Sequence, residues 1–246
     1  MSGLETQLSI LWPALIAGLL VVLSHVPLGQ QVLTRGIVFI DLAIAQVAGL
    51  GVIAALLGAV LLNWTERNRP EVQEALIGVL FVLASTAQIL LLANNPHGGE
   101  ALKDLLAGQI LWVSSEQLIR AAVLTLLFLV AWFRWRERIG RVGFYVLFAL
   151  MVTMSVQLVG VYLVFTTLIV PAVATYRHAS SRQLTLGYAL AFASYALGLG
   201  ASVVTDLPSS PVIVWAMAAV AIAVHLTARA PQGSAAGSVW FETSPH

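Results

Sequence analysis

Three polar side chains lie inside long apolar stretches of this sequence, where they could act on an ion: Asp41, Gln46 and Gln157. Burying a charged carboxylate in a bilayer costs about 2.5–3.5 kcal/mol on insertion scales, and such residues usually line an ion path. Asp41 also lies close to the start of its predicted helix, where it could instead cap the helix or sit at the membrane interface. Both interpretations of Asp41 stay open from the sequence.

Gln46 lies deeper in the same predicted helix. Its amide oxygen could coordinate a partly dehydrated cation, or the side chain could hydrogen-bond a neighbouring helix, which is common in membrane bundles. Residues five apart on a straight helix are rotated by about 140°, so Asp41 and Gln46 face different sides. Gln157 has the same two interpretations, and an interhelical hydrogen bond is the favoured one. We take Asp41 and Gln46 as candidates for lining a metal path and Gln157 as a weaker candidate.

Other metal and nucleotide chemistry has little support. The sequence has no cysteine, which excludes thiolate metal sites and disulfides. No His-x-x-x-His or Asp-x-Asp pattern indicates a closed metal cage. No Gly-x-x-x-x-Gly-Lys-Ser/Thr loop is present, so the chain does not bind ATP by that loop. We predict no stably bound cofactor, a solvated loop for His97, Glu100 and Asp104, and an interfacial position for His25.

The composition predicts a membrane protein. Of the 246 residues, 59% are hydrophobic and 9% are charged, whereas soluble domains carry about 25% charged residues. With about 20 residues per span, the chain can form an all-α, polytopic transmembrane bundle of about seven or eight spans. We predict one permease domain over residues 1–228 and a disordered cytoplasmic tail over 229–246, which is rich in Gly, Ser, Ala and Pro. The net charge of +1 gives no reason to expect nucleic-acid binding.

The apolar runs indicate where the spans lie. Pro27 is predicted to end the first span, and Pro27–Gly36 to form a polar link. The stretch Val142–Tyr176 carries no formal charge and is too long for one span, so we predict two segments with a broken helix near 160–171. The other predicted spans are residues 8–26, 37–62, 75–92, 118–133, 184–204 and 212–226.

Basic residues in short loops set the predicted orientation. Arg177 and Arg182 are expected to be cytoplasmic, as are four arginines that could contact a partner protein or anionic lipid. Those four are Arg134, Arg136, Arg138 and Arg141. Both termini are then predicted to be cytoplasmic, and Arg35 falls on the opposite side of the membrane.

Five blocks of the sequence match, in order, the motifs of a known transporter family. Arg35–Gly51 (R-G-I-V-F-I-D-L-A-I-A-Q-V-A-G-L-G) is similar to R-R-x-x-x-x-G-D-A-L-S-H-A-x-x-P-G, and Gly160–Ala174 (G-V-Y-L-V-F-T-T-L-I-V-P-A-V-A) to G-x-L-L-V-x-A-L-L-I-I-P-A-A-x-A. The other three blocks are Glu74–Gly78, Leu106–Ser114 and Asp206–Ile213. Together they resemble the zinc, manganese and iron permeases of ATP-binding-cassette (ABC) transporters.

This resemblance implies a homodimer of permeases in a bacterial-type inner membrane, served by separate ATPase subunits and an extracytoplasmic metal-binding protein. It implies that a divalent metal is the transported substrate, imported by alternating access. We weighed two alternatives: a stand-alone transporter or channel, and a non-transporting scaffold derived from such a permease.

The chain departs from the family pattern in three places. An ungapped match puts Leu42 where the family has Asp and Gln46 where it has His, so Asp41 is displaced by one position. The stretch between Asp41 and Glu74 is shorter than in the family, and we expect it to lack a span. The family's cytoplasmic F-D-x-x-x-A-x-x-x-G element is reduced to Phe133–Gly143.

Overall fold

The computed structural model describes residues 3–68, 70, 73–92, 99, 106, 108, 110–135 and 138–227. Over these residues the chain forms nine helices of ten or more residues and one short 3-10 helix, with no strand. The elements are α1 (Gly3–Arg35), α2 (Ile40–Gly49), α3 (Val52–Asn68), α4 (Gln73–Leu92), η2 (Ile110–Trp112), α6 (Ser115–Trp135), α7 (Gly140–Val159), α8 (Val161–Thr175), α9 (Ser180–Thr205) and α10 (Ser209–Thr227).

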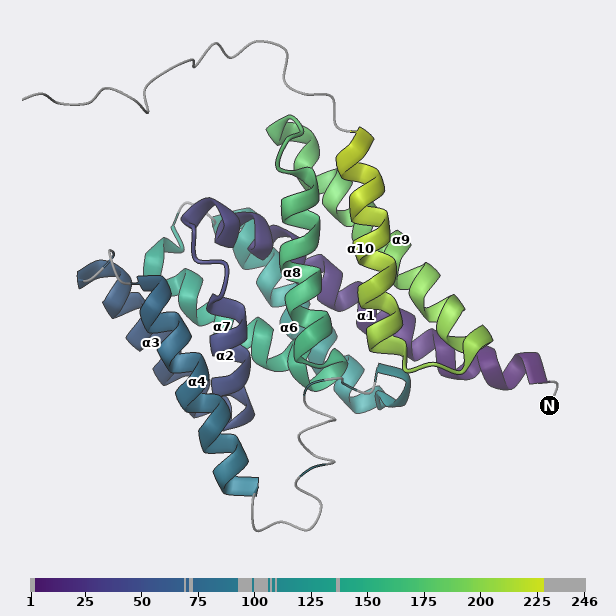
Figure 1. Cartoon of the computed structure of the whole chain (residues 1–246), viewed down its shortest axis with the longest axis horizontal. Coiled ribbons are helices and arrows are strands. Elements are labelled where there is room, and N and C mark those ends of the chain that lie inside the picture. The colour runs from purple at the N-terminus through teal and green to yellow at the C-terminus, as the bar shows by residue number, and fades with distance from the viewer. Residues whose placement is uncertain are drawn as a thin grey trace, which may run out of the picture.

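The helices form the bundle that the composition predicts (Figure 1). Four segments of the described chain are long and apolar enough to cross a membrane, and four shorter helices are also apolar. The long segments are Leu11–Arg35, Ser115–Trp135, Gly140–Val159 and Ser180–Thr205, and the short ones are Ile40–Gly49, Leu76–Gln88, Val161–Thr175 and Ser209–Val224. The predicted all-α transmembrane fold is therefore confirmed.

The first helix is longer than predicted, because α1 continues through Pro27 to Arg35. A proline inside a helix has no N–H for the carbonyl four residues earlier, which here belongs to Leu23. The hydroxyl of Tyr188, on α9, donates a hydrogen bond of 3.0 Å to that carbonyl. The freed backbone group is thus satisfied by a neighbouring helix, so Pro27 does not end the span.

The single span predicted over residues 37–62 is two helices. The chain turns at Leu50 and Gly51, where Gly51 has φ 119°, a backbone conformation that favours glycine. Because α2 and α3 run in opposite directions (Figure 1), the chain doubles back here, and the expected loss of a span relative to the family stays a prediction.

The break predicted near residue 160 is confirmed at its start. Gly160 separates α7 from α8 with φ 82° and ψ 162°, a region that other residues adopt only with strain. Beyond it, α8 continues through Pro171 to Thr175 without a second interruption. The broken segment is therefore one hinge between two helices.

Most basic groups of the described chain lie at one end of the bundle. Arg35, at the end of α1, lies 3.7 Å from Glu66 of α3, and Glu66 lies 3.8 Å from Arg141 of α7. Arg35 is therefore on the same side as Arg141, and the predicted opposite placement is wrong. By the positive-inside rule we expect this end to face the cytoplasm. Figure 1 shows that α1 begins at the other end, so this expectation disagrees with the predicted cytoplasmic N-terminus, and the orientation stays a prediction.

The start of α6 shows how a local sequence fixes a helix end. The Ser114 hydroxyl accepts a hydrogen bond of 3.2 Å from the backbone N–H of Gln117, and the Gln117 side-chain oxygen accepts one of 2.9 Å from the N–H of Ser114. This reciprocal pair is a capping box, which satisfies N–H groups that have no partner inside the helix.

We predict that Tyr188→Phe destabilises the protein by about 0.6–1.7 kcal/mol, because the Leu23 carbonyl loses its donor inside the bundle. The matched control is Tyr162→Phe, since Tyr162 is exposed. Thermal unfolding of both purified variants in detergent measures the difference. Equal unfolding temperatures for the two variants would show that the Leu23 carbonyl needs no hydrogen-bond donor from another helix.

Candidate substrate path

Asp41 is completely buried in the first turn of α2. Neither of its carboxylate oxygens has a hydrogen-bond partner among the described residues. The residue before α2 makes no side-chain cap, and Asp41 does not cap the helix either. Asp41 is thus not a helix cap but a buried carboxyl group with no hydrogen-bond partner in the described chain, and its place on a metal path or near the membrane interface stays a prediction.

Gln46 takes part in an interhelical hydrogen bond with a residue that the sequence analysis missed. Gln88, on α4, donates from its side-chain nitrogen to the Gln46 side-chain oxygen at 3.0 Å and also to the Gln46 backbone carbonyl. A Cβ atom at Gly49 would overlap the Gln88 amide, so the glycine makes room for it. The packing interpretation of Gln46 is confirmed, and its part in a metal path stays a prediction.

The pair Gln46 and Gln88 had one recognisable signal in the sequence. Both glutamines lie inside apolar runs, where a polar side chain needs a partner from another helix. The sequence alone gives no distance between them, because the two residues are 42 positions apart.

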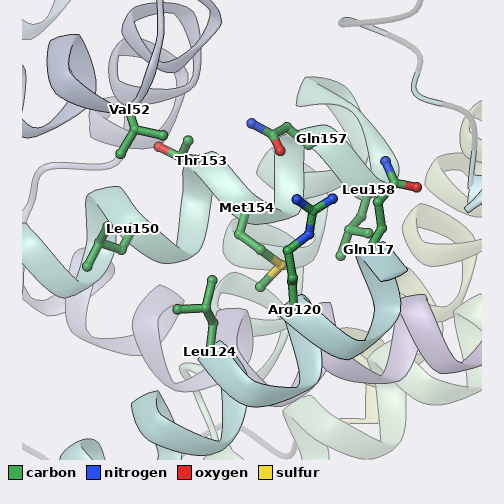
Figure 2. Close-up of a pocket in the computed structure, with 9 residues that line it drawn as sticks. All are labelled: Val52, Gln117, Arg120, Leu124, Leu150, Thr153, Met154, Gln157 and Leu158. Carbon is green, nitrogen blue, oxygen red and sulfur yellow. The ribbon is translucent and has the colours of Figure 1, made fainter. Parts of the chain in front are cut away.

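Gln157 lies at the surface of a hollow of about 230 Å³ between α3, α6 and α7. Figure 2 shows Arg120 rising from α6 toward the level of Gln157 on α7, with Met154 beside it and Leu124 lower down. Arg120 is 65% exposed and lies 3.6 Å from Glu116 in an ion pair. The role of Gln157 stays a prediction.

The four arginines proposed to contact a partner do not have equivalent environments. Arg134, Arg138 and Arg141 are all exposed, but Arg141 also lies 3.8 Å from Glu66 in an ion pair. Arg136 lies outside the described residues. Arg134 and Arg138 remain available for a partner or for lipid headgroups.

In the described chain, no histidine donates a hydrogen bond to the Asp41 carboxyl group. His25, predicted at an interface, is wholly buried inside α1, with its Nδ1 2.9 Å from the Ser24 hydroxyl and 3.1 Å from the Val21 carbonyl. Among the described residues, no three His, Cys, Asp or Glu side chains lie together as a metal-binding group. The predicted solvated loop with His97, Glu100 and Asp104 has these three residues outside the described part of the chain.

Comparisons with known proteins agree with this architecture. The sequence model of the ABC 3 transport family matches residues 7–140 and 136–228. The chain belongs to this family. A solved structure of PsaBC from Streptococcus pneumoniae in complex with a Fab is similar in fold, with a TM-score of 0.76 and 20% identity over 90% of this chain and 92% of that chain. No curated protein matches the sequence.

Membership identifies the chain as a multi-pass permease of the metal-transporting ABC family, so the resemblance seen in the sequence is confirmed. The permease carries its departure from the family motif on α2, where Asp41 is the sole formally charged side chain that is fully buried in the described chain. On this helix the structure has one buried carboxyl group, Asp41, and one amide, Gln46, which accepts a hydrogen bond from the Gln88 amide.

We predict an energetic coupling of about 0.6 kcal/mol between Gln46 and Gln88, the average for interhelical hydrogen bonds in membranes. A double-mutant cycle of Gln46→Leu, Gln88→Leu and the double variant measures it through detergent unfolding temperatures. Additive effects of the two substitutions would indicate that the glutamines pack without a favourable bond. Thr86→Val is the control, because Thr86 bonds only within α4, to Val82 and Leu83, in the described structure.

Proposed function

We propose that this chain is the membrane-spanning permease subunit of an ATP-driven importer of divalent metal ions, with Asp41 on the metal path. Family membership supports the transport role. The observation that carries the assignment of the path is the carboxyl group of Asp41, buried and without a hydrogen-bond partner in the described chain.

A charged carboxylate at this place needs a compensating partner. The N-terminal end of α2 compensates part of the negative charge, because the first turn of a helix carries a partial positive charge. That interaction contributes at most about 2 kcal/mol in partly buried sites, whereas an unpaired charge in a low-dielectric interior costs several kcal/mol. A passing divalent cation is the partner that completes the site.

Manganese is favoured over zinc as the substrate. The candidate ligand atoms are both oxygens on α2, namely the Asp41 carboxylate and the Gln46 amide oxygen, which accepts a hydrogen bond from Gln88 of α4. Carboxylate and carbonyl oxygens suit Mg²⁺, Ca²⁺ and Mn²⁺, while imidazole suits zinc. The replacement of the family's histidine by Gln46 thus shifts the preference toward the harder ion.

The proposed assembly follows the family. The permease pairs with a second copy, two separate ATPase subunits bind its cytoplasmic end, and a metal-binding protein docks at the outer end. Arg134 and Arg138 are candidates for the ATPase contact, because both are exposed beside the start of α7. We place the complex in a bacterial-type inner membrane, with residues 1–228 as one permease domain and 229–246 as a cytoplasmic tail.

A stand-alone transporter or channel and a non-transporting scaffold are the alternatives. The first would move metal without an ATPase subunit. The second has in its favour the loss of the family's Asp–His pair, since the described residues hold no three-ligand metal group. The buried, unpaired Asp41 argues against a scaffold, because a carboxyl group inside a membrane lowers the stability of the protein unless it has a function.

We predict that Asp41→Asn lowers manganese uptake by at least about tenfold, because the site loses its negative charge, and about 1.4 kcal/mol of cation stabilisation corresponds to that factor. The measurement is accumulation of radiolabelled manganese in a host without its own manganese and zinc importers. The host expresses the chain with its candidate ATPase and metal-binding protein.

The matched control for this experiment is Asp206→Asn. Asp206 is an exposed carboxylate in the left-handed region with φ 53°, which asparagine also tolerates. Uptake that survives both substitutions would move the path away from Asp41. Uptake that persists with an inactive ATPase would favour the stand-alone transporter, and no uptake by folded wild-type protein would favour the scaffold.

We predict that Gln46→His raises the ratio of zinc to manganese uptake, because it replaces an amide oxygen on α2 with an imidazole nitrogen, a ligand that suits zinc. Competition between the two radiolabelled metals measures the ratio. Gln46→Asn is the control, since it keeps an amide oxygen. A ratio that is the same in both variants would show that residue 46 does not contact the metal.

A further inference from the structure

Three helix ends meet at one carboxylate on the basic end of the bundle. Glu66, near the end of α3, lies 3.7 Å from Arg35, the last residue of α1, and 3.8 Å from Arg141, the second residue of α7. Because the three helices are separate segments of the chain, these two ion pairs hold their ends together.

Arg35 has a second contact that fixes its position. Its guanidinium carbon lies 4.2 Å from the centre of the Phe144 ring, a cation–π geometry. Phe144 is buried and packs against Trp132, Tyr145 and Phe148. The ion pairs are thus attached to a rigid aromatic cluster between α6 and α7.

This charged cluster is close in the chain to the candidate metal site. The link from Arg35 to the start of α2 spans residues 36–39, and Asp41 follows in the first turn of α2. Ile37, within the link, is 4% exposed and Asp41 is 0% exposed. Asp41 is therefore closed off in this structure, and its end of α2 is the end where the charged cluster lies.

We propose that Glu66, Arg35 and Arg141 form the inner gate of the permease, which must separate for metal to leave Asp41 toward the cytoplasm. The proposal rests on the proposed function, in which Asp41 lies on the metal path. Two arginines against one carboxylate leave a net positive charge at the exit, which repels a departing cation until the cluster moves.

The strength of the contacts suits a gate. Glu66 is 18% exposed and Arg141 is 51% exposed at the side chain, so the pairs are partly screened by water. Such pairs are each worth about 0.2–1 kcal/mol, which is enough to favour the closed state and small enough to be broken in every transport cycle.

The test measures access to the link behind the gate. A thiol introduced by Ile37→Cys is unique, because the chain has no cysteine of its own. Its rate of reaction with a membrane-impermeant maleimide is measured in inside-out vesicles that contain the full chain. We expect Glu66→Gln to raise the rate about fivefold, since loss of both ion pairs at about 0.5 kcal/mol each corresponds to that factor. Arg141→Gln, which breaks one pair, should raise it by less.

Glu116→Gln is the matched control, because it breaks an exposed ion pair with Arg120 at 3.6 Å, away from the cluster. An unchanged rate in both gate variants overturns the proposal, and so does an equal rise in the Glu116 variant, which would indicate general loosening. If the Glu66 variant does not accumulate in the membrane, Arg141→Gln decides, since Arg141 is half exposed. The assay needs neither metal nor transport, so its result is independent of the uptake experiment on Asp41.

Discussion

Every polar group inside a bilayer needs a partner within the protein, and this constraint governs most of the permease. The carbonyl freed by Pro27 is met by Tyr188 from another helix. Some buried hydroxyls follow the same rule locally: Thr153 and Ser194 donate to carbonyls one turn earlier in their own helices, at 2.7 and 2.8 Å. Other buried polar atoms have no partner among the described residues, the Thr125 and Ser155 hydroxyls included. Asp41 differs from these neutral groups because its side chain is formally charged, and an intramembrane ionisable group is a candidate for an ion path.

The same constraint explains why the two helix breaks are tolerated. At Gly160 the backbone N–H still donates to Val156 at 2.9 Å, and the Gly160 carbonyl accepts from Val164 at 3.1 Å. At Gly51 the N–H donates to Ala48 at 2.9 Å. Each glycine turns the chain while its backbone groups stay paired. The breaks therefore change helix direction without leaving polar groups exposed to lipid.

Hydropathy predicted the helical bundle, because that depends on the total length of apolar sequence. The break at Gly160 was predictable because a glycine lies inside an uncharged stretch that is too long for one span. Hydropathy failed where a distant partner decides the outcome. Tyr188, which lets α1 pass Pro27, lies 165 residues from Leu23 in the sequence. The misplaced Arg35 followed from counting residues 37–62 as one span. In the candidate site the residue types were visible, but neither the Gln88 contact nor the isolation of Asp41 can be read from one sequence.

The charges along the proposed route favour passage of a metal ion over its storage. A divalent cation beside Asp41 meets one formal negative charge in a fully buried setting, whereas sites that retain calcium tightly gather several carboxylates. Toward the cytoplasm it then meets Arg35 and Arg141, whose charges exceed that of Glu66. Weak binding at Asp41 and repulsion by the two arginines prevent the ion from binding stably inside the membrane. In the proposed assembly, tight capture is the task of the extracytoplasmic metal-binding protein, and the ATPase supplies the energy that moves the gate.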